Sequence, residues 1–220
     1  MTPVSRRRHW VIGDVHGCAE SLAELLRHLP GDDRLIFCGD VINRGPGIAA
    51  TMERIWDLVE RDRAVWLRGN HEQDLIDALQ AGGELAERHL AGCDTFRHLG
   101  EQHCRAWLGR LERLPLAYWG DGWVATHAGF DPTTWQPDLR VRMGFWQHYD
   151  GRFGEVVIGH TPGPHVRHLQ HIVMVDTGAC YGGSLSAYCP ETGLDISVPG
   201  LRPEAGGPLP GLSRLALSGR

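Results

Sequence analysis

The first hundred residues alternate short apolar runs with longer stretches of helical period. The runs "HWVI", "RLIFC" and "AVWL" precede "AESLAELLRHL", "IAATMERIWDLVERD" and "EQDLIDALQ". In the first of these stretches Leu22, Leu25, Leu26 and Leu29 recur at the spacing of one helix face. Helices with one apolar face, each following a buried strand, predict an α/β fold with a mostly parallel sheet.

Beyond residue 80 the pattern changes twice. Residues 81–115 hold helical pieces such as "AGGELAERHL" and "CRAWLGRLERL", which predict a helical insertion of the kind that covers a site. From Leu116 the apolar runs shorten to "LAYW", "GWVAT", "EVVIG", "IVMVD", "LSAYC" and "LDISV", which predicts antiparallel strands in a second packed sheet. We expect one domain over residues 1–200 and a Gly- and Pro-rich surface tail over 201–220.

Composition narrows the classes of function. A chain of 220 residues has room for one domain with a large core. The formal net charge of -5 argues against the clustered basic face that bulk nucleic-acid binding requires. No apolar segment is long enough to span a bilayer, so no membrane association is expected. Six cysteines without a C-x-x-C pair predict reduced thiols and a cytoplasmic location.

Polar residues of the metal-binding kind follow five of the predicted strands. They are Asp14 and His16, Asp40, Asn70 and His71, His127, and His160. Each alone has an ordinary explanation as a helix cap, a turn former or a buried histidine. Because the carboxyl ends of strands border the ligand crevice of an open α/β sheet, all five together predict a site at one edge.

The residue types at these strand ends predict the chemistry of the site. Aspartate, asparagine and histidine without cysteine suit hard or borderline divalent metals. Two ions fit, with Asp40 as the bridge between them. The remaining ligands would be Asp14 and His16 for one ion, and Asn70, His127 and His160 for the other. Two ions about 3.5 to 4 Å apart would deprotonate a bridging water and clamp a phosphoryl group.

The motifs "GDVHG", "GDVINRG", "RGNHE", "HAG" and "GHTP", in this order, resemble the metallophosphoesterases of the phosphoprotein phosphatase superfamily. The resemblance covers residues 9–190 and is strongest to bacterial and bacteriophage-type serine/threonine protein phosphatases. It implies a calcineurin-like fold, with two packed mixed β-sheets flanked by helices in a four-layer α/β/β/α sandwich. It also implies two divalent ions, with manganese as the first expectation and iron, zinc, magnesium or nickel as alternatives.

The resemblance also implies roles for individual residues. It gives the same six metal ligands: Asp14, His16, Asp40, Asn70, His127 and His160. Arg44 and Asn70 would contact the phosphate, and a second arginine is expected from "DLRVRMGFW", where Arg142 is preferred to Arg140 and both have a surface-charge alternative. His71 would be the general acid that protonates the leaving oxygen after attack by a metal-bridging hydroxide.

Asn43 departs from the family pattern, because most of the protein phosphatases have an aspartate at its position. We expect the Asn43 carbonyl to accept a hydrogen bond from His71 and to set its tautomer, without the full charge that would hold an imidazolium. The pKa of His71 should then be lower than in an aspartate-bearing relative. Such an enzyme would prefer substrates whose leaving groups need less protonation.

The predicted function is phosphomonoester hydrolysis, with phosphoserine or phosphothreonine in proteins as the first substrate class. The alternative is symmetrical dinucleoside tetraphosphate hydrolysis, because "RGPG" and "DTGACYGGSL" also resemble that group, which lacks the aspartate. A non-catalytic metal-binding interaction module is the third reading, favoured only by Asn43. The expected partners are therefore a phosphorylated protein or a small phosphorylated molecule such as a dinucleotide, and the oligomeric state stays open.

Overall fold

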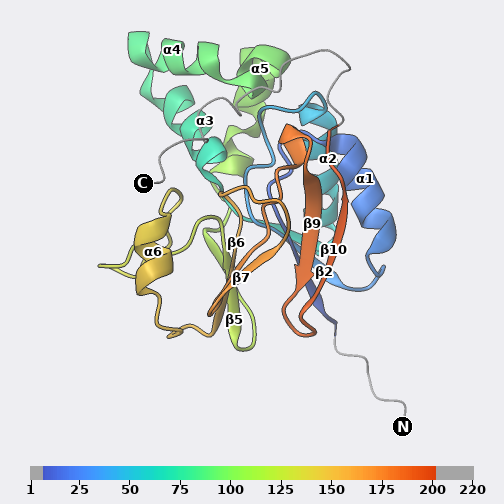
Figure 1. The fold of residues 1–220 in the computed structure, drawn as a ribbon. Helices are drawn as coiled ribbons and strands as arrows, with labels where there is room; N and C mark the ends of the chain where they lie inside the picture. Colours follow the sequence, from blue (N-terminus) through green and yellow to red (C-terminus); the bar gives the residue numbers. More distant parts are fainter. Residues whose placement is uncertain (1–6, 202–220) are drawn as a thin grey trace.

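The computed structural model describes residues 7–201, which form two five-stranded sheets packed face to face (Figure 1). The first sheet has the order β10-β9-β1-β2-β3. Its three N-terminal strands pair in parallel, and β9 and β10 add an antiparallel edge. The bounds are β1 (His9–Ile12), β2 (Arg34–Phe37), β3 (Ala64–Trp66), β9 (Ser184–Cys189) and β10 (Leu194–Pro199).

The second sheet has the order β4-β5-β6-β8-β7. Its strands are β4 (Ala117–Trp119), β5 (Trp123–Thr126), β6 (Glu155–Ile158), β7 (Arg167–Leu169) and β8 (Ile172–Met174). The expectation of antiparallel strands is wrong for the three central ones, because β5, β6 and β8 run parallel and only the edge pairs are antiparallel. Their crossovers hold one short helix or the added strand β7, so the sequence lacks the long helical period that marks a parallel connection.

Helices lie on the first sheet and above one edge of both sheets (Figure 1). They are α1 (Ala19–His28), α2 (Ile48–Glu60), α3 (Asn70–Ala81), α4 (Gly83–Gly92), α5 (Asp94–Leu111), α6 (Met143–His148) and the 3-10 turn η1 (Ala179–Tyr181). The predicted insertion over 81–115 is α4 and α5. On the outer face of the second sheet the described helix is the six-residue α6, so this fourth layer of the predicted sandwich is thin.

Strand β1 shows how the layers are assembled from the sequence. Trp10 and Ile12 pack with the helices on one face of the first sheet, whereas Val11 packs between the two sheets. Successive side chains of a strand point to opposite faces, so an unbroken apolar run serves both cores. The carboxyl end of this doubly buried strand therefore lies in the interior, beside the second sheet.

Three further observations concern the surface and the chain end. His165, His168 and His171 are exposed, which is typical of solvated surface histidines. Apart from Leu201, the predicted tail over 201–220 lies outside the described residues. Within residues 7–201 no helix is long and apolar enough to cross a membrane.

Replacing Leu22 by alanine should lower the free energy of unfolding by about 2–5 kcal/mol, because its side chain is fully buried between α1 and the first sheet. The matched control is Leu85→Ala on α4, where the side chain is 68% exposed and the change should stay within about 0.5 kcal/mol. Urea titration at fixed metal concentration measures both. Equal effects of the two variants would contradict this packing.

Candidate metal centre

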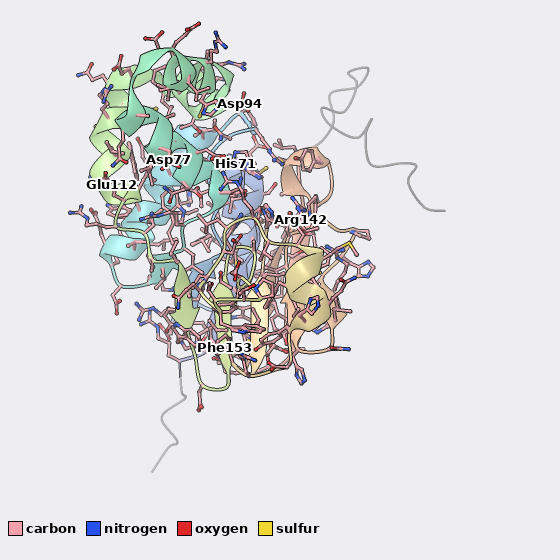
Figure 2. The ribbon with its side chains drawn as sticks, turned by 90° about the vertical axis from the view of Figure 1, so that its left-hand side faces the viewer. His71, Asp77, Asp94, Glu112, Arg142 and Phe153 are labelled. Carbon is pink, nitrogen blue, oxygen red and sulfur yellow. The ribbon has the colours of Figure 1, made fainter. Side chains whose placement is uncertain are left out.

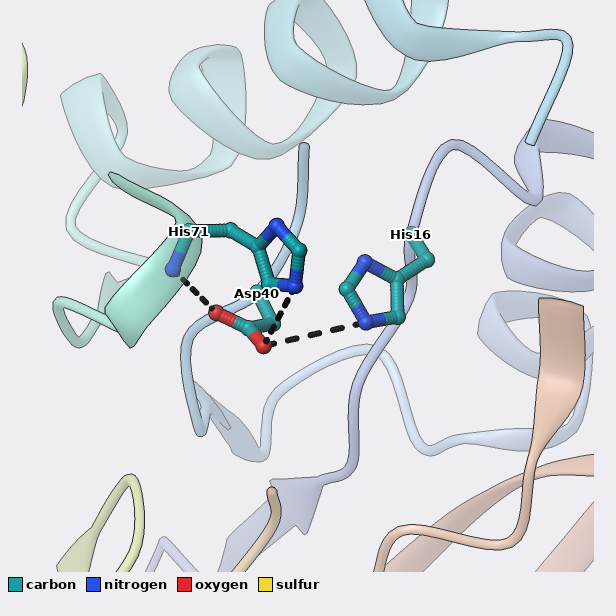
Figure 3. A group of neighbouring side chains, drawn as sticks. All are labelled: His16, Asp40 and His71. Carbon is teal, nitrogen blue, oxygen red and sulfur yellow. Dashed lines mark hydrogen bonds and ion pairs between the residues drawn. The ribbon is translucent and has the colours of Figure 1, made fainter. Parts of the chain in front are cut away.

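Asp40 lies at the junction of the two sheets, within 4 Å of three histidine rings, of which Figure 3 shows His16 and His71. Its Oδ2 atom is 3.7 Å from His16 Nε2, 3.5 Å from His127 Nε2 and 3.8 Å from His71 Nε2. Asp40 and His16 follow strands of the first sheet, and His127 follows β5 of the second. The strand ends thus converge as the sequence pattern predicts.

The histidines around Asp40 are oriented as metal ligands are. His16 Nδ1 lies 2.8 Å from the Ile42 carbonyl, and His127 Nδ1 lies 2.7 Å from the Cys38 carbonyl. Because a carbonyl oxygen only accepts, both Nδ1 atoms carry the proton and both Nε2 lone pairs are free. His160 Nε2 is buried and has no hydrogen-bond partner among residues 7–201. Three imidazole nitrogens are therefore available to divalent ions.

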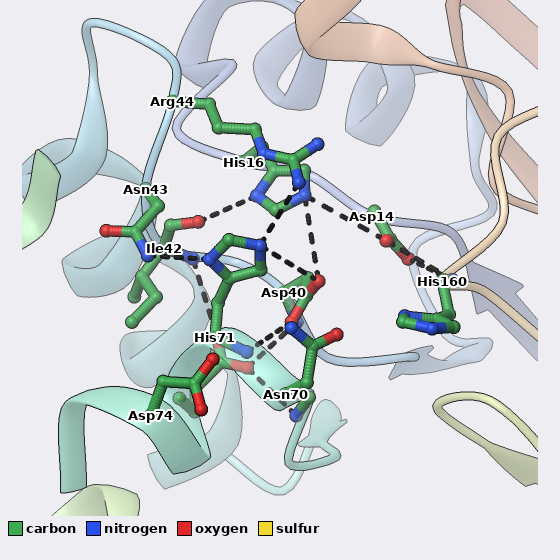
Figure 4. A network of polar contacts seen from close by, with 12 residues as sticks. Asp14, His16, Asp40, Ile42, Asn43, Arg44, Asn70, His71, Asp74 and His160 are labelled. Atoms are coloured by element: carbon green, nitrogen blue, oxygen red, sulfur yellow. Dashed lines mark hydrogen bonds and ion pairs between the residues drawn. The ribbon is translucent and has the colours of Figure 1, made fainter. Parts of the chain in front are cut away.

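The two remaining predicted ligands complete the site (Figure 4). Asp14 accepts hydrogen bonds from the His160 backbone N–H at 3.0 and 3.2 Å, and Asn70 Oδ1 lies 3.0 Å from His127 Nε2. Two groups of candidate ligand atoms share Asp40, one with His127 and His160, the other with His16 and His71. The shared carboxylate fits the predicted bridge, whereas the presence of His71 in the second group differs from the predicted ligand set.

The charges at this junction also fit bound cations. Burial raises the pKa of Asp40 to about 7, and burial followed by repulsion from Asp176 and Asp40 raises the pKa of Asp14 well above its usual range. Burial lowers the pKa of His127 to about 4 and that of His160 to about 3. Ionised carboxylates beside neutral imidazoles need a compensating positive charge, and divalent ions on these donors would supply it.

Asp176 is a site residue that the sequence reasoning missed. It follows β8, is buried, and accepts a hydrogen bond from the Gly178 N–H at 3.0 Å. Burial raises its pKa to about 6, and its charge acts on Asp14. The signal was present in the sequence, because Asp176 follows the apolar run "IVMV" as the other site residues follow theirs.

Glu72 supports the loop that carries Asp40. It lies in the first turn of α3 and closes the capping box of that helix by accepting the Gly69 N–H at 2.9 Å. It is also fully buried and accepts the backbone N–H groups of Asp40 and Val41, each at 2.9 Å. One carboxylate thus fixes the loop after β2 to the start of α3, and so positions Asp40 relative to Asn70.

Several site residues have a left-handed backbone, which is unfavourable for residues other than glycine. The φ angles are 44° at His16, 49° at Asp40, 66° at Asn43, 70° at Arg44 and 66° at His160. Such conformations persist only where surrounding contacts enforce them. Their concentration at this edge is typical of a functional site.

The predicted phosphate-binding arginines lie on two sides of the site. The Arg44 guanidinium stacks on the Tyr181 ring at 4.9 Å, and its Nη2 lies 3.2 Å from His71 Nε2. Arg142 donates to the Thr161 hydroxyl at 2.7 Å, next to His160; Figure 2 labels Arg142 and His71. Arg140 instead pairs with Asp74. Arg142 therefore stays the predicted second phosphate ligand.

Asn43 is oriented opposite to our expectation (Figure 4). Its Oδ1 accepts the Thr95 backbone N–H at 2.9 Å and the Thr95 hydroxyl at 2.8 Å, so its Nδ2 faces His71 Nδ1 at 2.7 Å. A backbone N–H can only donate, which fixes the oxygen side of the amide, and an amide nitrogen can only donate in turn. The Asn43 carbonyl therefore does not accept from His71. His71 Nδ1 is the acceptor.

The consequence for His71 is a neutral ring whose single proton sits on Nε2. Burial and then the Arg44 charge lower the pKa of His71 to about 3, which also favours the neutral ring. Thr95, at the start of α5, sets this arrangement from outside the motifs, and its backbone position gives no signal in the sequence. Its hydroxyl also accepts the Asn43 backbone N–H at 2.9 Å.

Residues 7–197 match the family model of calcineurin-like phosphoesterases. The chain belongs to this family. The family is one of metallophosphoesterases, so the chain is a hydrolase for which divalent metal ions are implied. The fold and the junction of donor side chains agree with this membership.

Relatives of the chain carry two kinds of name. It is 30% identical over 203 residues to serine/threonine-protein phosphatase 1 of Salmonella typhimurium, covering 82% of this chain and 90% of that protein. It is 39% identical over 133 residues to a symmetrical bis(5'-nucleosyl)-tetraphosphatase of Ralstonia nicotianae, covering 60% of this chain and only 45% of that protein. The names leave the substrate unresolved.

A solved structure of similar shape supports the fold alone. It is titled as a candidate diadenosine tetraphosphatase and superposes with a TM-score of 0.68. The match covers 91% of this chain and 97% of that one, at 23% sequence identity. The two-sheet architecture predicted from the motifs is thus confirmed.

Binding of Mn²⁺ to the metal-free protein should release protons below about pH 7 and few above about pH 8. The raised pKa values of Asp14 and Asp40 mean that these carboxyls hold protons at low pH and must lose them to bind metal, whereas the histidines are already neutral. Affinity should therefore rise with pH and level off above the Asp40 pKa. Calorimetry in buffers of different ionisation enthalpy counts the protons.

Asp77→Asn, on the exposed side of α3, is the control for this experiment and should leave proton release unchanged. Proton release that is absent at about pH 6.5, or that grows with rising pH, would contradict the assignment of Asp14 and Asp40 as buried, proton-holding ligands.

Proposed function

We propose that the chain hydrolyses the phosphoanhydride bond of a dinucleoside polyphosphate at a dinuclear metal centre. The observation that carries this choice is the hydrogen bond from Asn43 Nδ2 to His71 Nδ1. It makes His71 a hydrogen-bond donor at Nε2 rather than a charged acid. A phosphate leaving group departs as a stable anion and needs only such a donor, whereas a serine alkoxide needs a full proton.

The six predicted ligands, Asp14, His16, Asp40, Asn70, His127 and His160, would hold the two ions, with Asp40 shared. When bound, two divalent ions activate water and polarise the phosphoryl oxygens. Glu72 keeps the Asp40 loop in place through its four backbone hydrogen bonds, so the ligands are preorganised before any ion enters.

Arg44 and His71 act together on the substrate oxygens. The proton of His71 Nε2 and the Arg44 Nη2 group are both donors, and the two nitrogens lie 3.2 Å apart. Two donors this close can share one acceptor, and an oxygen of the scissile phosphate would accept from both. Arg142, bonded to Thr161 beside His160, would contact a second phosphoryl oxygen, which limits rotation of the phosphate during in-line displacement.

A phosphoprotein substrate is the second candidate, because the relative that spans 82% of this chain is named a serine/threonine-protein phosphatase. In that case Asn43 would lower the activity on phosphoserine without abolishing it. A non-catalytic module is disfavoured, since the ligand set, Arg44 and His71 are all in place. A cytoplasmic location and manganese as the metal stay predictions.

The function is tested with Mn²⁺-loaded protein on diadenosine tetraphosphate and on a phosphoserine peptide, comparing kcat/KM at several pH values. The proposal expects the dinucleotide to be preferred at every pH. A preference for the peptide would contradict the proposal and support the second candidate, a phosphoprotein substrate. Failure to hydrolyse either, with two metals bound, would support the non-catalytic reading.

Asn43→Asp should shift this preference toward phosphomonoesters. An aspartate held by the Thr95 N–H accepts from His71 Nδ1, favours the imidazolium and restores a general acid, which is worth about 10²-fold or more for an alkoxide leaving group. The kcat/KM ratio of peptide to dinucleotide should rise at least about tenfold. Asn43→Ala, which removes the donor without adding charge, is the control; an Asp variant with full metal content and an unchanged ratio would contradict the mechanism.

A further inference from the structure

A pocket of about 420 Å³ opens directly beside His71, under helix α4. Asn43, Arg44 and His71 form its inner end, and α3, α4 and the turn into α5 form the rest. This volume is within the range of small-molecule sites and far larger than a serine side chain requires. None of the six metal ligands lines it.

The pocket lies where the leaving group of the substrate would pass. In-line displacement places the attacking and leaving oxygens on opposite sides of the phosphorus atom. Asp40 Oδ2 lies 3.8 Å from His71 Nε2, whereas none of the six predicted ligands lines the pocket, whose inner end includes His71 and Arg44. A group that leaves past His71 therefore enters this pocket.

The walls of the pocket combine an apolar surface with few free polar groups. Leu75 and Ala78 from α3 face Leu90 from α4. The two acidic side chains of the lining already have partners within the protein. Asp74 pairs with Arg140, and Asp94 accepts the Arg44 backbone N–H at 3.1 Å. The lining therefore favours a flat apolar group attached to an anion.

His89 is the polar side chain of the lining that is open to a ligand. It lies on α4, and no hydrogen bond, ion pair or ring contact joins it to another described residue between 7 and 201. An imidazole can donate to or accept from the edge of a heterocyclic base. Arg88, on the same rim, pairs with Glu84, so Arg44 at the inner end carries the positive charge for a phosphate chain.

We propose that this pocket binds the nucleoside of the leaving nucleotide, with the base against the Leu75, Ala78 and Leu90 wall and its edge at His89. The proposal rests on the proposed phosphoanhydride hydrolysis and extends it, because it assigns substrate selection to the helical insertion over 81–115. A phosphopeptide chain is the competing occupant.

The first test fills the pocket. His89→Trp adds an indole to the pocket wall from an exposed position on α4, and Ala78→Phe adds a phenyl ring from α3. The matched control is Leu85→Trp, which also lies on α4 but outside the lining, at a side chain that is 68% exposed. The kcat/KM ratio of diadenosine tetraphosphate to p-nitrophenyl phosphate should fall roughly 10- to 100-fold in His89→Trp and stay constant in the control. An unchanged ratio in a folded, metal-loaded His89→Trp protein overturns the assignment.

The second test separates this proposal from the catalytic one, because it needs no turnover. Calorimetry on the Mn²⁺-loaded protein compares AMP with inorganic phosphate. AMP should bind at least about tenfold more tightly than phosphate, and His89→Trp should remove that advantage. Equal affinities in the wild-type chain would overturn the nucleoside pocket. A wild-type chain that prefers AMP to phosphate but hydrolyses only the phosphopeptide would instead refute the proposed function and keep the pocket.

Discussion

Buried negative charge at the meeting point of the two sheets is the constraint on which this structure depends. Asp14, Asp40 and Asp176 end strands from both sheets in an interior where carboxylates cannot stay ionised without nearby positive charge. Neutral histidines with free Nε2 atoms surround them, and Glu72 fixes the intervening loop. The architecture thus presents donors for divalent ions at one edge, and the left-handed backbone angles there indicate how tightly that edge is held.

Two hydrogen bonds and one close contact connect this centre to the helical insertion. The Thr95 N–H holds Asn43 Oδ1, Asn43 Nδ2 donates to His71 Nδ1, and His71 Nε2 faces Arg44. An aspartate in place of Asn43 would accept a hydrogen bond from His71 Nδ1, whereas the Asn43 amide donates to it. The residue at position 43 therefore decides which nitrogen of His71 carries the proton. The insertion both orients His71, the proposed general acid, and lines the adjacent pocket, so the proposed leaving-group chemistry and leaving-group recognition share one element.

The sequence predicted most of the site because the signal was periodic. Apolar runs that end in aspartate, asparagine or histidine pointed to all six predicted ligands, since strand direction alone brings them to one edge. The same rule would have found Asp176. The rule could not predict that β5, β6 and β8 run parallel, because their crossovers lack a long helical period. It also could not predict the orientation of Asn43, because Thr95 sets that orientation from the start of a helix far along the chain.

The central claim is that His71 is neutral, with its proton on Nε2 and Nδ1 accepting from Asn43. Nitrogen-15 NMR of histidine-labelled, Mg²⁺-loaded protein at about pH 7 reports this directly, with His71→Gln used to assign the signals. The account predicts a pyridine-type shift for His71 Nδ1 and a pyrrole-type shift for Nε2, and a protonated Nδ1 in Asn43→Asp. A protonated Nδ1 in the unaltered chain would contradict it.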